Sequence, residues 1–394
     1  MKQALEGVRI VDFTQMMLGP FGTQFLGDMG ADIIKIERPV TGEWERGLAA
    51  MGQLLGGDSP FFLAMNRNKR SLTLDLKAEE ARRIIEKLVR DADVVVENFR
   101  PGVLDKLGLD YAHLREVNPR IIYASGSGYG PSGPYLKRPG QDLLIQALSG
   151  YVAQNGKASE PPVPSACSVM DASTALTLAL SIMVALFCRE RTGIGQKVDA
   201  SLFNTAIAIQ CQELVAHMNL PVSAARSAAG IGAPWLSAPF GVYAAADGYV
   251  AISINPLPAV GEALGIPELL AFDTDEKAYA GRDQVRRILD ERLRDRPSAE
   301  ILDALYARDL WCAKVQGFDE VMSDPQVAHN GLIHEVDRPK AGRIKIVGVP
   351  VRFSETPGTI RLAPPLVGEH TDAILEELGY SAEQRADLRA RGVV

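Results

Sequence analysis

Asp171 is the residue whose type and position most directly suggest chemistry. It precedes an uncharged run, rich in Ala and Leu, from Ala172 to Cys188, after which charge returns at Arg189. A carboxylate in the first turn of a helix lies beside unpaired backbone N–H groups, which stabilise its ionised form. At the edge of a dry core it can act as a nucleophile, since little water is present to hydrolyse an acyl intermediate. Asp171 is therefore either such a nucleophile or the N-cap of a helix.

The apolar run after Asp171 predicts a helix that is buried on most faces. The run from Ala172 to Cys188 contains neither Gly nor Pro and is apolar nearly all round. A membrane span is the alternative, but the run is just shorter than the roughly 18 residues that a span needs. We therefore expect a core helix and no membrane partner.

Composition indicates an ordinary globular protein. The chain has 394 residues, of which 46% are apolar and 23% charged, and this length is enough for two domains. Its net charge of −7 argues against a nucleic-acid partner. The N-terminus lacks the apolar segment and cleavage site of a signal peptide, so we expect a cytoplasmic location. Four cysteines without CxxC spacing are expected to be small core residues in a reducing compartment: Cys167, Cys188, Cys211 and Cys312.

The first half of the chain has an α/β pattern. A strand at residues 8–13, a turn and helix at 19–30 and a second strand at 31–37 make a βαβ unit. Its glycines do not form GxGxxG, so no nicotinamide cofactor is assigned. Strands at residues 93–97 and 120–125 follow. Because open α/β sheets bind ligands beyond the carboxyl ends of their strands, Asn98 and Arg100 are candidate ligand contacts. A helix cap is the other explanation for Asn98.

Other segments carry less information about function. The basic cluster Arg67, Lys69 and Arg70 predicts a solvated loop or hairpin tip. The second half predicts one helix over residues 203–219, a hairpin around Asp247 and helices from about Val260 to Asp309. No metal-ligand spacing is present.

Several motifs, in order, are similar to the class III CoA-transferase family. They are VRIVDFTQMMLGPFGTQFLGDMGADIIKIER, NRNKRSLTLDLK, DVVVENFRPGVLDKLG, NPRIIYASGSGYGPSGPY, SVMDAS, RERTGIGQKVDASL and PPLVGEHTDAILEELG. The resemblance implies an α/β fold in which both chain ends, residues 1–200 and 340–394, form a Rossmann-like large domain. It also implies a smaller α+β domain over residues 225–325 and an interlocked homodimer.

The same resemblance implies an activity and its residues. CoA would pass from an acyl-CoA donor to a carboxylic acid, through an aspartyl anhydride and an aspartyl-CoA thioester on Asp171, without a metal. CoA, as part of the acyl-CoA substrate, would be bound by Arg38, the segment from Leu74 to Lys77, Asn98, Phe99, Arg100 and Lys106. The acid would be bound near Met17, Gln141, Asp142, Gly230 and Gly232.

Departures from the family pattern narrow the substrate and define the alternatives. Met17 stands where formyl-CoA transferase has an active-site Gln, and Gln141 stands where it has a Tyr, so formate and oxalate are not expected substrates. The related alpha-methylacyl-CoA racemases use a His opposite the shared Asp, but Gln141 occupies that position and an amide cannot deprotonate a carbon acid. A racemase-like enzyme and a non-catalytic acyl-CoA-binding protein remain the alternatives.

Overall fold

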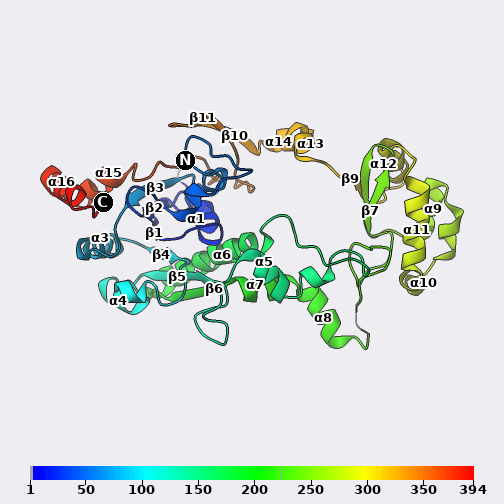
Figure 1. The fold of residues 1–394 in the computed structure, drawn as a ribbon, viewed down its shortest axis with the longest axis horizontal. Coiled ribbons are helices and arrows are strands. Elements are labelled where there is room, and N and C mark those ends of the chain that lie inside the picture. Colours follow the sequence, from blue (N-terminus) through cyan, green and yellow to red (C-terminus); the bar gives the residue numbers. More distant parts are fainter. Residues whose placement is uncertain (1–2, 223) are drawn as a thin grey trace. The chain divides into compact units, whose positions relative to one another are not determined.

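A six-stranded parallel sheet organises the part of the chain that carries the candidate site. The computed structural model describes residues 3–222 and 224–394. The strands run in the order β3-β2-β1-β4-β5-β6 (Figure 1). They are β1 (Arg9–Asp12), β2 (Asp32–Glu37), β3 (Lys69–Thr73), β4 (Val94–Glu97), β5 (Ile122–Ser127) and β6 (Lys197–Ser201). This doubly wound order reverses between β1 and β4. The predicted α/β class and Rossmann-like sheet are confirmed.

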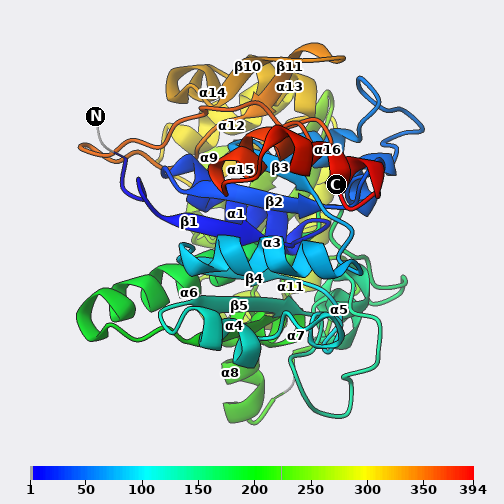
Figure 2. The ribbon, with the colours of Figure 1, turned by 90° about the vertical axis from the view of Figure 1, so that its left-hand side faces the viewer.

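Helices cover both faces of this sheet (Figure 2). One face packs against α3 (Glu79–Arg90), α4 (Tyr111–Val117), α15 (Thr371–Glu377) and α16 (Ala382–Ala390). The strands contribute alternate residues to this core, among them Val11, Ile34 and Leu72. The residues between them, such as Asp12 and Lys35, point to the opposite face because strand side chains alternate. On that face lie α1 (Leu18–Asp28) and α6 (Val169–Thr192).

The helices α1 and α6 approach each other closely near their first turns. A Cβ atom on Gly22 would lie 2.8 Å from the backbone oxygen of Ala175, so only glycine permits this approach. At its other end α6 stops at Gly193. This residue has a φ of 76°, a left-handed backbone conformation that favours glycine at the end of a helix.

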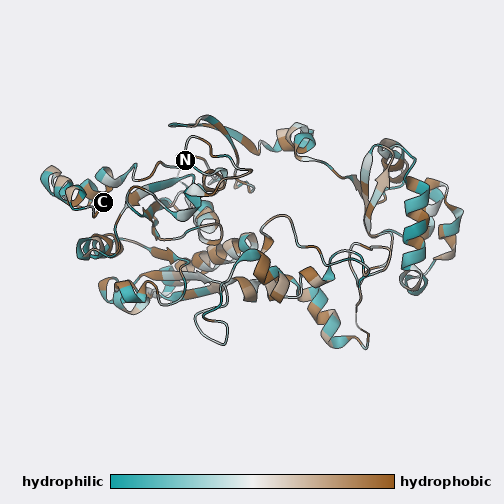
Figure 3. Ribbon diagram, in the orientation of Figure 1, coloured by the Kyte–Doolittle hydropathy of each residue, from teal (hydrophilic) through white to brown (hydrophobic). Residues whose placement is uncertain are grey.

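The prediction that the apolar helix is buried on most faces is wrong for this chain. One face of α6 packs against α1 and the strands β5 and β6. The other face exposes a stripe at helical spacing, which consists of Leu176, Leu180, Val184 and Phe187. Figure 3 colours the ribbon, α6 included, by the hydropathy of each residue. By length and composition alone, α6 could also cross a membrane. The packed face, however, is that of a core helix.

The chain divides into two compact units. Unit 1 comprises residues 1–145, 168–206 and 325–394, and unit 2 comprises residues 146–167 and 207–324. Besides the sheet and its helices, unit 1 contains η1 (Trp44–Gly47), α2 (Pro60–Met65), η2 (Asp105–Leu107), α14 (Pro325–Asn330) and the hairpin β10 (Ile333–Arg338) and β11 (Gly342–Val347). The helix α5 (Asp142–Leu148) begins in unit 1 and ends in unit 2. The helix α7 (Leu202–Ile209) begins in unit 1.

Unit 2 has its own core around a small antiparallel sheet. Its strands are β7 (Gly241–Ala245), β8 (Gly248–Ile252) and β9 (Cys312–Lys314). Apolar side chains of this sheet pack with those of the helices into one cluster. The helices are η3 (Val152–Gln154), α8 (Cys211–Asn219), α9 (Leu257–Leu264), η4 (Pro267–Ala271), α10 (Asp275–Ala280), α11 (Arg282–Leu293), α12 (Ser298–Tyr306) and α13 (Phe318–Ser323).

Two local predictions in this region are wrong. The single helix expected over residues 203–219 is broken at Gln210, whose backbone angles, a φ of −96° and a ψ of 25°, are not helical. Its side chain donates to the backbone oxygen of Ser149. The cysteines are not all core residues, because Cys167 and Cys211 are exposed; the four thiols are nevertheless unpaired.

Candidate active site

A cavity of about 450 Å³ opens beside the point where the strand order reverses, and we call it the Arg38 cavity. Loops after β1, β2, β3 and β4 contribute to its wall, which is the position expected for a ligand site in a doubly wound sheet. Of the residues predicted to bind CoA, it contains Arg38, Leu74, Lys77, Phe99 and Lys106. Gln15, in the loop between β1 and α1, also lines it and was not singled out from the sequence.

The charges of the Arg38 cavity suit an anionic ligand. Arg38, Lys77 and Lys106 are exposed and, within the described residues, form no ion pair. Cations without a carboxylate partner are available for phosphate oxygens. The ring of Phe99 offers a flat apolar surface beside them.

A smaller cavity of about 110 Å³ adjoins it through Phe99, and we call it the Arg100 cavity. Asn98 and Arg100 line it together with the glycine-rich loop after β5, including Gly128 and Gly130. Loops after neighbouring parallel strands thus bring all the predicted CoA contacts to one edge of the sheet.

Asp171 lies in the first turn of α6 but is not its N-cap. Ser168 holds the cap position, and Asp171 is the third helical residue. The backbone N–H groups of Met170 and Asp171 donate instead to Oδ1 of Asp142, at 2.8 and 3.0 Å. Within the described residues, no group forms a hydrogen bond or ion pair with the Asp171 carboxyl group. Asp142 therefore caps the helix, and the carboxyl group of Asp171 is left uncommitted.

The surroundings of Asp171 change its acidity. Burial, and then the negative charge of Asp142, raise the pKa of Asp171 to about 7. The carboxyl group thus titrates near neutral pH, and its ionised form is destabilised relative to an exposed aspartate. A destabilised carboxylate is a stronger nucleophile toward an activated carbonyl.

Glu45, in η1, is a second perturbed acid that the sequence reasoning missed. The residue is only 2% exposed, and its Oε2 atom is buried without a hydrogen-bond partner among the described residues. Burial, with the charges of Glu43 and Asp171, raises the pKa of Glu45 to about 8 against the opposing charges of Lys35 and Lys69. Glu45 is accordingly neutral when Asp171 begins to ionise. Only Glu43 among the groups that act on it is close in sequence, while Lys35, Lys69 and Asp171 come from β2, β3 and α6, so no local pattern marks Glu45.

The remaining predicted contacts are distributed over both units. Met17 is the residue before α1 and is half-buried, and Gln141 is exposed just before α5. Gly230, which has a φ of 88°, and Gly232 belong to unit 2. The backbone N–H of Gly230 donates to the hydroxyl of Ser227 at 2.7 Å. A role for these residues in substrate binding stays a prediction.

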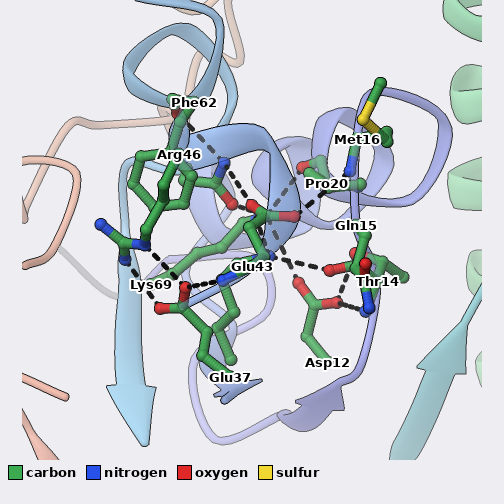
Figure 4. A network of polar contacts seen from close by, with 12 residues as sticks. Asp12, Thr14, Gln15, Met16, Pro20, Glu37, Glu43, Arg46, Phe62 and Lys69 are labelled. Atoms are coloured by element: carbon green, nitrogen blue, oxygen red, sulfur yellow. Dashed lines mark hydrogen bonds and ion pairs between the residues drawn. The ribbon is translucent and has the colours of Figure 1, made fainter. Parts of the chain in front are cut away.

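A buried ionic network supports the loops of the Arg38 cavity (Figure 4). Lys69 is fully buried and lies 3.3 Å from Asp12, while Lys35 is also fully buried and lies 3.1 Å from Glu43. Burial lowers the pKa of Lys69 to about 8, although the charge of Asp12 opposes this. The side chains of Asp12, Lys35 and Lys69 all start from the α1 side of the sheet.

The prediction of a solvated basic cluster is wrong. Arg67 is 4% exposed and forms a two-point ion pair with Asp28, while Arg70 binds Asp32 and Glu377. Lys69 begins β3 and is covered by α1. These partners lie far away in sequence, so a local window of residues could not reveal them.

Among the described residues, no group of three or more His, Cys, Asp or Glu side chains could hold a metal ion.

Comparisons with known proteins show the family of this chain. The chain is 36% identical over 405 residues to a protein named acyl-CoA transferase from Fusarium pseudograminearum, covering 99% of this chain and 88% of the relative. It is 32% identical over 397 residues to human succinyl-CoA:glutarate CoA-transferase, covering 99% and 90%. A crystal structure of a CAIB/BAIF family protein from Brucella suis superposes with a TM-score of 0.83 at 32% identity, covering 96% of this chain and 100% of that one. The sequence model of CoA-transferase family III matches residues 5–371. The chain belongs to CoA-transferase family III, whose members use CoA thioesters as substrates.

Proposed function

We propose that this enzyme transfers CoA from an acyl-CoA donor to a carboxylic acid, with Asp171 as the covalent nucleophile. One observation carries the proposal. The Asp171 carboxyl group stands at the start of a helix whose N–H groups are already capped by Asp142, and it has no partner of its own among the described residues. A cap would use its carboxylate, whereas a nucleophile needs it uncommitted.

The first half of the proposed reaction moves CoA onto the enzyme. A carboxylate oxygen of Asp171 attacks the thioester carbonyl, the carbon–sulfur bond breaks, and CoA leaves as thiolate. The thiolate then attacks the Asp171 carbonyl of the resulting anhydride. Cleavage of the adjacent carbon–oxygen bond releases the donor acid and leaves an aspartyl-CoA thioester.

The second half runs in reverse with the acceptor. Its carboxylate attacks the aspartyl thioester, CoA thiolate leaves, and a new anhydride forms. The thiolate attacks the acceptor carbonyl, which gives the product acyl-CoA and frees the Asp171 carboxylate. No step requires a proton, so an uncommitted carboxylate without a histidine partner suffices. The N–H groups of Met170 and Asp171 are bound to Asp142, so backbone N–H groups of the glycine-rich loops would stabilise the oxyanions.

We propose that CoA binds in the Arg38 and Arg100 cavities. Their exposed cations, Arg38, Lys77, Arg100 and Lys106, would bind phosphate oxygens, and Phe99 would pack against the adenine. Dicarboxylic acids are the first donors and acceptors to test, because one relative is named succinyl-CoA:glutarate CoA-transferase. Formate and oxalate remain unexpected because Met17 and Gln141 replace the polar groups described above.

We also propose a homodimer, interlocked as the family resemblance implies, with large-domain limits at residues 1–200 and 340–394 and a small domain at 225–325. The exposed stripe of α6 supports a protein partner, because the opposite face of that helix packs on the sheet and cannot meet lipid. The four unpaired thiols support a reducing compartment such as the cytoplasm.

Exchange of a labelled free acid into its acyl-CoA tests the proposed activity. Asp171→Asn, which keeps the size of the side chain, should lower exchange by at least about 10³-fold, as for the loss of other covalent nucleophiles. Asp110→Asn is the matched control, because Asp110 caps α4 and lines neither cavity. Its exchange rate should stay near that of the wild type. Full exchange by Asp171→Asn would overturn the proposal.

Two further results would favour the alternatives. Wash-in of deuterium from heavy water at the alpha carbon of a 2-methylacyl-CoA, without acid exchange, would identify a racemase-like enzyme. Binding of CoA by the wild type without any exchange across a panel of acids would identify a binding protein.

A further inference from the structure

The loop between β1 and α1, residues 14–17, is held by side chains from outside the loop. The N–H of Thr14 donates to Oδ1 of Asp12 at 2.8 Å, and its carbonyl oxygen accepts from Lys35 Nζ at 2.9 Å. The N–H of Met16 donates to Oε2 of Glu43 at 3.2 Å (Figure 4). A surface loop normally leaves such groups to water.

Asn98, which follows β4, grips the same loop at two points. Its Oδ1 accepts from the backbone N–H of Gln15 at 2.8 Å, and its Nδ2 donates to the carbonyl oxygen of Gln15 at 2.7 Å. The last backbone bond between these segments runs from Phe13 N–H to the Val96 oxygen, at 2.8 Å. The Asn98 amide thus supplies the next pair of ladder bonds after the two strands have ended.

The grip holds a backbone conformation that costs free energy. Met16 has a φ of 60°, in the left-handed region that disfavours side chains by about 1 kcal/mol or more. Such a residue persists only when its surroundings fix it. The two bonds to Gln15, just before this position, and the bond to the N–H of Met16 itself fix it here.

The loop joins the proposed binding and reacting regions. Gln15 lines the Arg38 cavity together with Phe99, the residue after Asn98. Met17 immediately precedes α1. Gly22 of α1 contacts α6 at Ala175, which lies one helical turn after Asp171. A displacement of the loop would therefore change the cavity wall and the start of α1 together.

We propose that Asn98 is a positioning residue, which locks the loops after β1 and β4 into one wall of the Arg38 cavity, and that its amide is committed to Gln15 rather than to a ligand. The expected effect on ligand affinity rests on the proposed CoA site. The lock, by which we mean the fixing of the loops after β1 and β4 by the Asn98 amide, does not depend on that site.

Two measurements separate these parts. Asn98→Ala should raise hydrogen–deuterium exchange in the segment from Phe13 to Leu18 by about five- to tenfold, the loss expected for a backbone hydrogen bond of about 1 kcal/mol. It should weaken CoA binding, measured by titration calorimetry with CoA itself, by about tenfold. Asn98→Asp keeps the acceptor but sets an anion against the Gln15 carbonyl, so it should show the same two changes.

Asn118→Ala is the matched control. The Asn118 amide also bridges backbone groups, donating to the oxygens of Val89 and Ala92 at 2.9 Å and accepting from the N–H of Arg120 at 3.0 Å, but it lines neither cavity. Its loss should leave CoA affinity and exchange in the loop unchanged. Loop exchange that is the same in Asn98→Ala and Asn118→Ala would overturn the lock.

The outcomes also distinguish failure of the CoA site from failure of the lock. If the wild type binds no CoA, the proposed site fails, while the exchange measurement still decides the lock. If the wild type binds CoA and both Asn98 variants bind it equally well, the positioning role is wrong.

Discussion

At the scale of single residues, the site depends on which carboxyl groups are committed. Asp142 is bound to the first turn of α6, and Asp171 has no hydrogen-bond partner among the described residues. The spacing alone favoured a cap for Asp171, because most Asp residues before apolar helices are caps, and the family resemblance alone favoured a nucleophile. What separates them is Asp142, whose approach to α6 depends on the tertiary fold.

The raised pKa of Asp171 predicts a pH profile. Only the ionised carboxylate attacks, so transfer should rise with pH, about tenfold per unit below the pKa, and level off above about 7. The profile would be measured as acid exchange at acyl-CoA concentrations well below saturation, where the rate reports the ionisation of the free enzyme. A rate that is flat across this range would contradict the assignment.

Glu45→Gln tests whether the rise of the transfer rate with pH is due to ionisation of Asp171. Because the pKa of Glu45 is about 8, its side chain is still neutral where Asp171 ionises, and an amide at this position should leave the rise of the rate near pH 7 in place.

The raised pKa values of Asp171 and Glu45 also make the stability of the fold depend on pH. The contribution of these two carboxyl groups to the free energy of unfolding is fully present below their pKa values in the unfolded chain. It is lost as the pH rises through their folded pKa values of about 7 and 8.

At the scale of elements, the strands of the sheet could be predicted from the sequence, but the buried polar contacts between them and the neighbouring loops and helices could not. The apolar strands and the βαβ unit follow from local pattern, and the structure confirms them. The pattern could not show that Lys69 is buried, because its partners Asp12 and Pro20 come from β1 and α1. Asn98 is similar: the family resemblance predicts a CoA contact, but the structure shows its amide bound to Gln15.

The buried network predicts a large stability effect at Lys69. Lys69→Met leaves Asp12, Asn66 and the carbonyl of Pro20 without their buried cation, so the free energy of unfolding should fall by about 3–5 kcal/mol. Denaturant unfolding would measure it. Arg83→Met, which breaks an exposed pair with Glu79, should change it by under about 1 kcal/mol. Equal effects of the two substitutions would show that the network contributes little.

At the scale of the whole molecule, α6 marks where sequence reasoning about a single chain fails. Apolar character all round predicts burial, yet Leu176, Leu180, Val184 and Phe187 are exposed in the isolated chain. Apolar residues are needed both in a core and in an interface with a second chain, so the pattern cannot distinguish the two. The proposed homodimer would cover this stripe.

The exposed stripe gives a test of assembly. Leu180→Arg places a charge in its centre, where Leu180 is 65% exposed, and should shift the mass found by size-exclusion chromatography with light scattering from two chains to one. Leu270→Arg, at an exposed leucine of unit 2, is the control and should leave the mass unchanged. A wild type that is already monomeric would contradict the dimer.

The oxygen atoms of Asp171 provide the most direct test of the central claim. In the proposed reaction the acceptor carboxylate attacks the aspartyl thioester, and its bridging oxygen stays on Asp171 when the product leaves. A turnover with an acceptor acid labelled in its carboxylate with oxygen-18 should therefore leave one heavy oxygen on the peptide that contains Asp171, as read by mass spectrometry. An unlabelled peptide after complete turnover would contradict covalent catalysis by Asp171.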